Sequence, residues 1–296
     1  MDFDASFFQT EVRSGFPVTE KRKKIWAAEL RILEQFDKVC SRLHLAWYAG
    51  YGTLLGAVRH QGFIPWDDDM DVVMFRDDYE VFQAAAPKEF QEPYCFQNTY
   101  SCGRLCAFSK IRDSRTAAVE FPDMPESYNQ GIFIDIFPLD SVRDDMDPQS
   151  CLTAGIQRLL WIAIVDPAAV MRELEQGRQL LIHSEFLLEY MKKDCRERFR
   201  IFEAFNRSRS DESQAVNFIT DEICPGGYRS IQREWFRDRV YLPFENIRIP
   251  VPVAYDRILR RWYGDYRQPV RGTSCHEGII LDPDRSYKEY LLPSLF

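Results

Sequence analysis

Apolar residues recur at spacings of three and four between residues 20 and 44, the pattern of one buried face of an α-helix. Thr19 is placed to cap the N-terminus of this helix. A short strand pattern over Ala46–Tyr51 follows, then Gly52-Thr53, then the helix-favouring segment Leu54–His60. We therefore expect a helix, a strand, a glycine turn and a second helix in this order.

Strand and helix patterns continue to alternate in the next segment. Asp69–Phe75 is expected to form a strand, and Arg76–Ala86 a helix that begins with acidic residues and stops at Pro87. Further strand patterns lie at Leu105–Arg112, Thr116–Phe121 and Ile132–Phe137. Interspersed strands and helices of this kind predict a sheet with flanking helices.

The pattern becomes helical after Pro148, which predicts a helical insert over about 148–215. Strand patterns return at Val240–Phe244 and Asn246–Val251, and a helix pattern follows at Tyr255–Tyr263. We predict a single domain over residues 1–296, of the α/β (α+β) class. Its mixed sheet would come from about 46–140 and 240–290.

Length and composition agree with a globular domain. The chain has 296 residues, 45% of them hydrophobic, which is enough for a sizeable core. No run approaches the ~18 apolar residues of a membrane helix, and the N-terminus lacks a signal-peptide pattern. No two of the eight cysteines have CxxC spacing, which favours reduced thiols. These features predict a cytoplasmic protein, with the inner face of the membrane as an alternative place of action.

Charge limits the classes of partner. A net charge of −8 argues against nucleic acid, because phosphate binding requires a basic face. The insert carries basic residues that would suit peripheral contact with an anionic membrane: Lys192, Lys193, Arg196, Arg198 and Arg200. The interleaved Asp194 and Glu197 favour an ordinary solvated helix face instead.

The run WDDDMD at residues 66–71 is the most informative local feature. Carboxylates at ~4 Å repel by about 1–4 kcal/mol, so a run of four beside an apolar strand needs a reason. On a strand, Asp69 and Asp71 share one face while Met70 points to the other. A hard cation, Mg²⁺ or Mn²⁺, suits such a pair. Asp67 would assist indirectly, and Asp68 should point elsewhere.

Two further features support the hypothesis of a reaction in which a cation acts on a phosphate group. A glycine turn such as Gly52-Thr53 at a helix N-terminus can bind a phosphate group. In the apolar run GIFIDIFP, Asp135 would be costly unless a metal or a basic partner neutralises it. Asp140, beyond Pro138, is expected to be a turn residue or a helix cap. A glycine turn, a carboxylate pair and a third carboxylate are typical of the nucleotidyltransferase fold.

Basic residues that could meet a polyphosphate are present as well. Lys110 and Arg112 have the same parity on one expected strand, so both project from one face. Arg59 and His60 end the helix that follows the glycine turn. The alternatives are solvated strand positions for the first pair and an ion pair with the acidic run for Arg59.

The longer motifs resemble those of the LicD family of phosphotransferases. The residues that carry the resemblance are GTLLGAVRH at 52–60, GFIPWDDDMD at 62–71, GIFIDIFPLD at 131–140, YGDY at 263–266 and His276. The resemblance implies a nucleotidyltransferase fold, a divalent cation and similarity to the fukutin and fukutin-related family. It also implies transfer of phosphocholine from CDP-choline to a hydroxyl of a cell-surface glycan, a teichoic acid precursor or a lipid-linked glycan.

Carried over by position, Asp69, Asp71 and Asp135 would be the catalytic and metal-binding carboxylates. Gly52 and Thr53 would bind the donor phosphate, and His276 is a candidate substrate contact. Four alternatives remain at this point. They are a nucleotidyltransferase that uses an NTP, a transferase of ribitol or glycerol phosphate, a DxD-type glycosyltransferase, and an inactive relative or Ca²⁺-binding interaction module.

Overall fold

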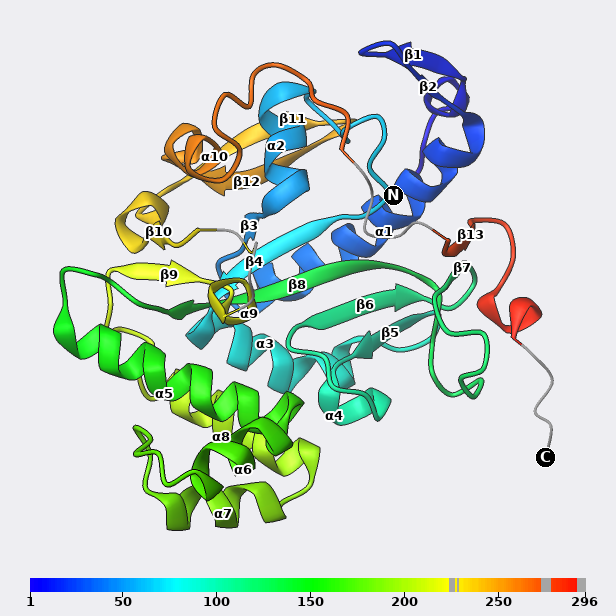
Figure 1. The fold of residues 1–296 in the computed structure, drawn as a ribbon. Helices are drawn as coiled ribbons and strands as arrows, with labels where there is room; N and C mark the ends of the chain where they lie inside the picture. Colours follow the sequence, from blue (N-terminus) through cyan, green and yellow to red (C-terminus); the bar gives the residue numbers. More distant parts are fainter. Residues whose placement is uncertain (224–226, 228, 273–277, 292–296) are drawn as a thin grey trace. The chain divides into compact units, whose positions relative to one another are not determined.

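The computed structural model describes residues 1–223, 227, 229–272 and 278–291, and the chain forms two compact units (Figure 1). The first unit comprises Met1–Met74, Asp78–Phe137 and Asp238–Phe296, and the second comprises Phe75–Asp77 and Pro138–Arg237. The insert predicted at about 148–215 falls within the second unit.

The first unit contains most of the strands. In chain order its elements are η1 (Ala5–Phe8), β1 (Glu11–Arg13), β2 (Phe16–Val18), α1 (Glu20–Arg42), β3 (Tyr48–Ala49), α2 (Tyr51–Arg59), β4 (Asp71–Phe75), α3 (Arg76–Glu89), β5 (Tyr94–Gln97), α4 (Thr99–Cys102), β6 (Ser109–Asp113), β7 (Ala117–Val119), β8 (Ile132–Ser141), β11 (Arg239–Phe244), β12 (Ile247–Pro252), α10 (Tyr255–Tyr263), β13 (Ile280–Asp282) and η3 (Tyr287–Tyr290). The last residue of β4, the first two of α3 and the end of β8 belong to the second unit.

The sheet of the first unit has the strand order β3-β4-β8-β6-β5 (Figure 1). Antiparallel registers pair Ile111 with Ile134 and Phe96 with Ile111, so these three side chains share one face. Phe96 contacts Phe82 of α3 at 5.9 Å between ring centroids, and Phe82 contacts Phe36 of α1 at 5.1 Å. This face of the sheet is therefore covered by α1 and α3.

Polar residues of β6 and β8 occupy the opposite face. Lys110 lies opposite Asp135 in the register, one position away from the apolar pair on each strand. Side chains alternate along a strand, so burial of the apolar residues against the two helices turns Lys110 and Asp135 away from them. The fold thereby places two charged groups together on the second face.

The predicted α/β class, with a sheet flanked by helices, is confirmed. The hydroxyl of Thr19 accepts a hydrogen bond from the backbone N–H of Arg22, so the predicted N-cap of α1 is correct. The helix α10 has the predicted bounds. Periodicity located these elements well because each buries one continuous face.

Three sequence predictions were wrong. Helix α3 runs through Pro87 to Glu89. A proline in the last turn removes only one backbone N–H donor, and the N–H of Phe90 still donates to the carbonyl oxygen of Ala86. Strands β11 and β12 pair with each other rather than with the main sheet, and β7 pairs with β13. The pattern of residues along a strand does not identify its partner strand.

The second unit is largely helical. Its elements after β8 are α5 (Pro148–Val165), α6 (Pro167–Glu175), α7 (Ser184–Lys192), α8 (Cys195–Arg207), β9 (Ala215–Asn217), α9 (Ile219–Ile223), β10 (Ile231–Gln232) and η2 (Arg233–Phe236). Among the described residues, no single helix is long and apolar enough to span a membrane. Only α5 and α6 together, bent by 112°, match a span by length and composition.

A buried charge cluster lies inside the second unit. Arg76 donates two hydrogen bonds of 2.7 Å to the carboxylate of Asp140 and one of 3.3 Å to Glu203. The side chains of Arg76 and Asp140 are 2% and 0% exposed. Asp140 is therefore a buried partner of Arg76 within β8, and its prediction as a turn residue or helix cap was wrong.

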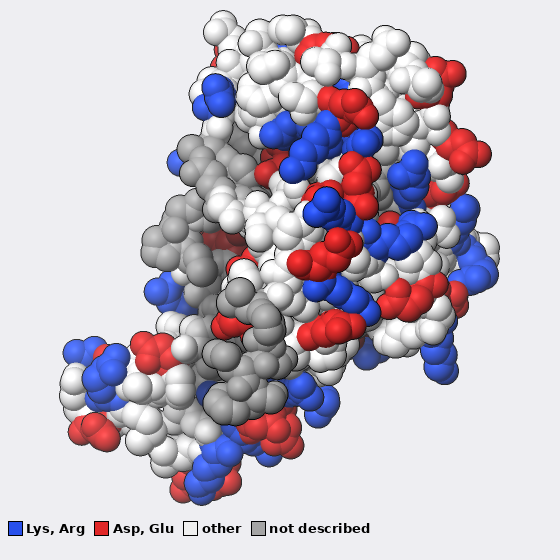
Figure 2. Space-filling model, turned by 90° about the vertical axis from the view of Figure 1, so that its right-hand side faces the viewer, with Lys and Arg blue, Asp and Glu red and all other residues white. Residues whose placement is uncertain are grey.

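Two predictions from composition can be compared with the structure. The six described cysteines (Cys40, Cys95, Cys102, Cys106, Cys151 and Cys195) are free, in agreement with reduced thiols. On the face drawn in Figure 2, acidic and basic side chains of the described residues are interspersed. The charges on this face therefore do not form a basic stripe.

Candidate functional site

The acidic run forms a loop that leads into β4. The strand begins at Asp71, so Asp69 and Met70 precede it, whereas the sequence placed them on it. One carboxylate oxygen from each of Asp67, Asp68 and Asp69 lies within 4.8 Å of the other two. Asp68 was expected to point elsewhere, and the loop conformation instead brings its carboxylate to the other two.

Two helices hold this loop in place. From α1, Arg22 Nη1 and Trp26 Nε1 donate to the carbonyl oxygen of Asp67, at 2.5 and 3.4 Å. From α2, the hydroxyl of Thr53 accepts a hydrogen bond of 2.8 Å from the backbone N–H of Asp71. Backbone contacts of Asp67 and Asp71 therefore hold the two ends of the loop.

Burial and mutual repulsion raise the pKa of two of these carboxyl groups well above the ordinary range. For Asp71, burial is the largest cause, followed by the charges of Asp69, Asp135 and Asp67, and Lys110 opposes them. For Asp67, burial is again the largest cause, followed by Asp69 and Asp68. The donor set consists of hard oxygen atoms with surplus negative charge, and these residues therefore fit a divalent cation such as Mg²⁺ or Mn²⁺.

Asp135 and Lys110 form an ion pair across β8 and β6. Lys110 Nζ lies 2.8 Å from Oδ1 and 3.1 Å from Oδ2 of Asp135. The ammonium group also lies 3.5 Å from the ring centroid of Phe133. A basic partner therefore neutralises Asp135 in this structure. Because both groups influence the pKa of Asp71, Lys110 and Asp135 adjoin the acidic loop.

Arg112 differs from Lys110 although both were predicted to contact donor phosphate. The Arg112 side chain is 1% exposed. Its guanidinium donates to Gln97 Oε1 at 2.7 Å and to the carbonyl oxygen of Gly131 at 3.0 Å. These contacts join neighbouring strands, so the guanidinium is engaged within the protein.

Substitutions of Lys110 and Arg112 should have different effects. Lys110→Met should lose activity by about tenfold or more, because a charge at the site is lost, and should also lower the melting temperature, because the buried Asp135 loses its partner. Arg112→Met should lower the melting temperature by several degrees, because Gln97 and Gly131 lose a buried partner. Thermal melting and a transfer assay on both variants check this. An unchanged melting temperature for Arg112→Met would show that its buried contacts are dispensable.

Gly52 and Thr53 both contact the acidic loop. A Cβ atom at Gly52 would lie 2.6 Å from Asp67 Oδ2, so the carboxylate occupies the space that a side chain would need. Tyr51, the first residue of α2, has a positive φ of 38°, a conformation uncommon for residues other than glycine. The glycine thus allows close approach of Asp67, and a role of Gly52 and Thr53 in binding phosphate stays a prediction.

Arg59 and His60 lie at the C-terminal end of α2. Arg59 Nη1 donates to the carbonyl oxygen of Tyr266 at 3.0 Å, which ties the segment after α10 to α2. Burial, with the nearby charges of Arg59 and Arg13, lowers the pKa of His60 to about 4. Among the described residues, His60 Nε2 has no hydrogen-bond partner. The candidate His276 lies outside the described residues.

His60 should make stability depend on pH. The folded protein keeps this imidazole neutral down to about pH 4, whereas the unfolded chain protonates it near pH 6.5. The unfolded state binds more protons in that window, so the stability contribution is lost as the pH falls through it. We expect His60→Gln to lose less stability than the parent between pH 6.5 and 4, as measured by urea unfolding at each pH. If the parent and His60→Gln lost stability equally as the pH falls, the lowered pKa of His60 would be contradicted.

Sequence reasoning did not bring together four aromatic residues that lie near the carboxylates. Tyr51 stacks on Trp262 at 5.1 Å, and its ring meets the ring of Phe137 edge to face at 5.2 Å. Phe137 in turn contacts Phe108 at 4.5 Å. Phe137 follows Asp135 by two positions on β8 and therefore shares its face. The equal parity of residues 135 and 137 indicated that Phe137 lies on the face of Asp135. The strand pattern could not predict the contact with Trp262 of α10.

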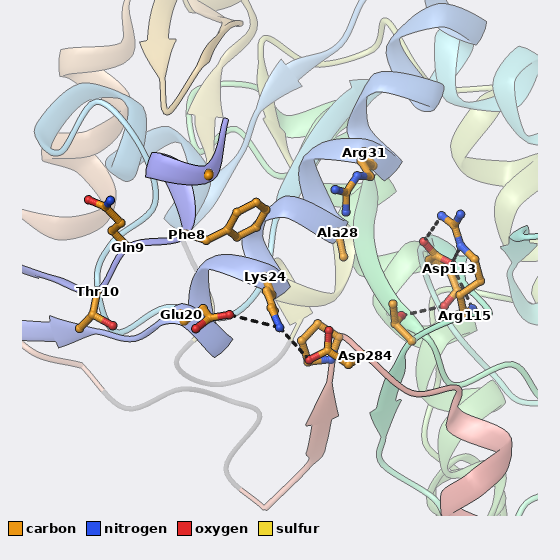
Figure 3. A pocket seen from close by; sticks show the side chains of 13 residues that line it. Phe8, Gln9, Thr10, Glu20, Lys24, Ala28, Arg31, Asp113, Arg115 and Asp284 are labelled. Carbon is orange, nitrogen blue, oxygen red and sulfur yellow. Dashed lines mark hydrogen bonds and ion pairs between the residues drawn. The ribbon is translucent and has the colours of Figure 1, made fainter. Parts of the chain in front are cut away.

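A cavity of about 800 Å³ lies elsewhere in the first unit (Figure 3). Lys24 and Arg115, which line it, already form ion pairs with Asp284 and Asp113, at 3.1 and 2.7 Å. None of the predicted site residues lines this cavity. The charged groups that line this cavity neutralise one another, whereas the carboxylate site carries surplus negative charge.

Comparison with known proteins supports the same part of the chain. The family model described as "LicD/FKTN/FKRP, nucleotidyltransferase domain" matches residues 44–159. The lipopolysaccharide cholinephosphotransferase LicD of Haemophilus influenzae is 29% identical over 247 residues, which cover 80% of this chain and 88% of that protein. An uncharacterized protein of Rickettsia typhi is 33% identical over 79 residues, 26% of each chain.

The matched residues 44–159 include the acidic loop, the glycine turn, Lys110 and Asp135. Residues 44–159 are therefore a LicD-family domain, and most of the chain is similar to a LicD protein. The resemblance seen in the sequence motifs is thereby confirmed.

Proposed function

We propose that this protein is a phosphotransferase that moves phosphocholine from CDP-choline to a hydroxyl group of a cell-surface glycan or its lipid-linked precursor. One observation carries the proposal. The carboxylates of the acidic loop adjoin an ion pair of Lys110 and Asp135, in a chain similar along most of its length to a cholinephosphotransferase. Mg²⁺ or Mn²⁺ fits the donor set and would supply charge neutralisation for a pyrophosphate.

Each residue has a role in this reaction. Asp69 and Asp71 would hold the cation, with Asp135 beside them. Lys110 would neutralise the transferring phosphoryl group, where electrostatics supply much of the rate. The acceptor oxygen forms a bond to the phosphorus of phosphocholine while the bond from that phosphorus to CMP breaks. Asp135 is the proposed acceptor of the hydroxyl proton, which leaves a glycan phosphodiester and CMP as products.

The aromatic residues favour choline as the alcohol of the donor. Quaternary ammonium groups bind the faces of aromatic rings, whereas ribitol and glycerol do not need them. Phe137 shares a face with Asp135, and Lys110 Nζ lies 5.2 Å from the ring centroid of Phe108. Transfer of ribitol or glycerol phosphate by the same carboxylates is the second candidate function.

A donor screen tests the proposal. The purified protein is incubated with Mg²⁺, lipopolysaccharide as acceptor, and CDP-choline, CDP-ethanolamine, CDP-ribitol, CDP-glycerol or CTP in parallel. We expect CMP release and acceptor labelling from CDP-choline, and neither in the presence of EDTA. Preference for CDP-ribitol or CDP-glycerol would establish the second candidate. Release of pyrophosphate from CTP would instead identify a nucleotidyltransferase.

A further inference from the structure

The cavity drawn in Figure 3 is lined by parts of the first unit that the proposed reaction does not use. Its volume of about 800 Å³ lies within the range of roughly 300–1,000 Å³ that is usual for sites of small ligands. Its walls come from four separate segments of the chain: the residues before β1, helix α1, the end of β6 with the turn after it, and the residues after β13. The tertiary fold therefore forms this cavity, rather than a single loop.

The charged side chains of the cavity sum to a formal charge of zero. Three acids and three bases line it: Glu20, Asp113, Asp284, Lys24, Arg31 and Arg115. Lys24 Nζ lies 3.3 Å from Glu20 and 3.1 Å from Asp284, and Arg115 lies 2.7 Å from Asp113. An anionic ligand would need surplus basic charge, and a cation would need surplus acidic charge. The balanced lining therefore favours an uncharged ligand with many polar groups.

The lining offers both donors and acceptors of hydrogen bonds to such a ligand. The guanidinium carbon of Arg31 lies 5.0 Å from the ring centroid of Phe3, and among the described residues Arg31 has no carboxylate partner. Its N–H groups are therefore open donors. The side chains of Glu20 and Asp284 are 62% and 63% exposed, so their carboxylates retain oxygens that can accept.

A carbohydrate fits this combination of groups. Each hydroxyl group of a sugar both donates and accepts hydrogen bonds, so it can use bases and acids together. The C–H face of a sugar ring is apolar and packs on an aromatic ring. Phe8 lies beside Ala28 of α1 in the cavity and supplies such a surface (Figure 3). A lipid chain would need a continuous apolar wall, which the six charged residues exclude.

We propose that this cavity binds a sugar unit of the acceptor glycan, at a distance from the hydroxyl group that reacts. The inference rests on the glycan acceptor of the proposed function. Lys24, Ala28 and Arg31 occupy one face of α1. Arg22 and Trp26 hold the acidic loop on the opposite face. The two places are separated by about one helix diameter, ~10–12 Å, and a glycan of several sugar units is long enough to occupy both.

The first test measures binding without donor or cation. The probe is the core oligosaccharide of lipopolysaccharide, freed of lipid and phosphate, and its affinity for the full chain is measured by isothermal titration calorimetry. We expect Arg31→Ala and Phe8→Ala to weaken binding about tenfold, because each removes a contact to the sugar. Lys38→Ala is the matched control, because Lys38 is an exposed basic residue of the same helix, and it should bind as the parent does. Both varied side chains are partly exposed, so the melting temperature should stay near that of the parent.

The second test connects the bound sugar to the acceptor. In both variants the KM for lipopolysaccharide should rise about tenfold, while the KM for CDP-choline and the release of CMP to water keep the parent's values. A parent that binds no oligosaccharide, or variants that bind it as tightly as the parent, would overturn the inference. Weaker binding with an unchanged KM for the acceptor would overturn the assignment to the acceptor. A parent that binds the oligosaccharide but releases no CMP from CDP-choline would count against the proposed function alone.

Discussion

Asp71→Asn is expected to reduce transfer activity by about 10²–10³-fold, because it removes a charge from the ligands of the proposed cation. Asparagine keeps the shape of the side chain. The backbone N–H of residue 71 can still donate to Thr53, so the start of β4 should not move. Initial rates of CMP release from CDP-choline, measured over a range of Mg²⁺ concentrations, check this expectation.

The same variant should fold at least as well as the parent without a cation. Asp71 is 8% exposed and lies near the charges of Asp69 and Asp135, so loss of its charge relieves repulsion. We expect its melting temperature in EDTA to match or exceed that of the parent, and to rise less when Mg²⁺ and donor are added. Asp123→Asn, an exposed acid, is the control. Full activity in Asp71→Asn would refute the assignment of Asp71 as a cation ligand.

Local features of the fold could be predicted from the sequence, but the pairing of strands could not. The apolar spacing of α1 and α10 gave their positions, and the hydroxyl of Thr19 identified a helix start, since each depends on nearby residues. The partner of β11 depends on tertiary contacts. A period of two describes a half-buried strand but leaves open which edge it joins.

The candidate site, too, could be predicted from the sequence only in part. Parity predicted that Lys110 and Arg112 share a face, and both cations lie over the ring of Phe133, at 3.5 and 4.7 Å. Their burial and partners differ, because Lys110 pairs with Asp135 while Arg112 bonds to Gln97. Cross-strand register decides between these outcomes, and one sequence does not contain it. Parity likewise failed for Asp68, which lies in a loop and not on a strand.

Glu29 of α1 illustrates a different limit. Burial and the nearby charges of the acidic loop raise its pKa well above the ordinary range. The spacing of Glu29 from Trp26 fits the apolar face of α1, so burial was predictable from the helix pattern. The identity of the opposing surface was not, because the acidic loop lies about forty residues further along the chain, as the contact between Trp26 and Asp67 shows. A buried acid next to other acids can be recognised only when both segments are placed.

Replacement of Arg76 by methionine should cause the largest loss of stability, about 3–5 kcal/mol in the free energy of unfolding. Arg76 is 2% exposed and holds the carboxylates of Asp140 and Glu203, which are 0% and 8% exposed. Loss of the guanidinium leaves two buried negative charges without their partner. Urea unfolding followed by circular dichroism measures the change. Arg143→Met is the control, since Arg143 pairs with Asp145 at the exposed surface and should change stability little.

A triple variant separates the value of the charges from the cost of leaving them unpaired. In Arg76→Met with Asp140→Leu and Glu203→Met, apolar side chains replace the whole cluster, so no buried charge remains. Buried ion pairs are often no more stable than apolar groups of similar volume, because desolvation offsets their attraction. We therefore expect the triple variant to regain most of the stability that Arg76→Met loses. A triple variant as unstable as the single one would show that the ion pairs themselves stabilise the second unit.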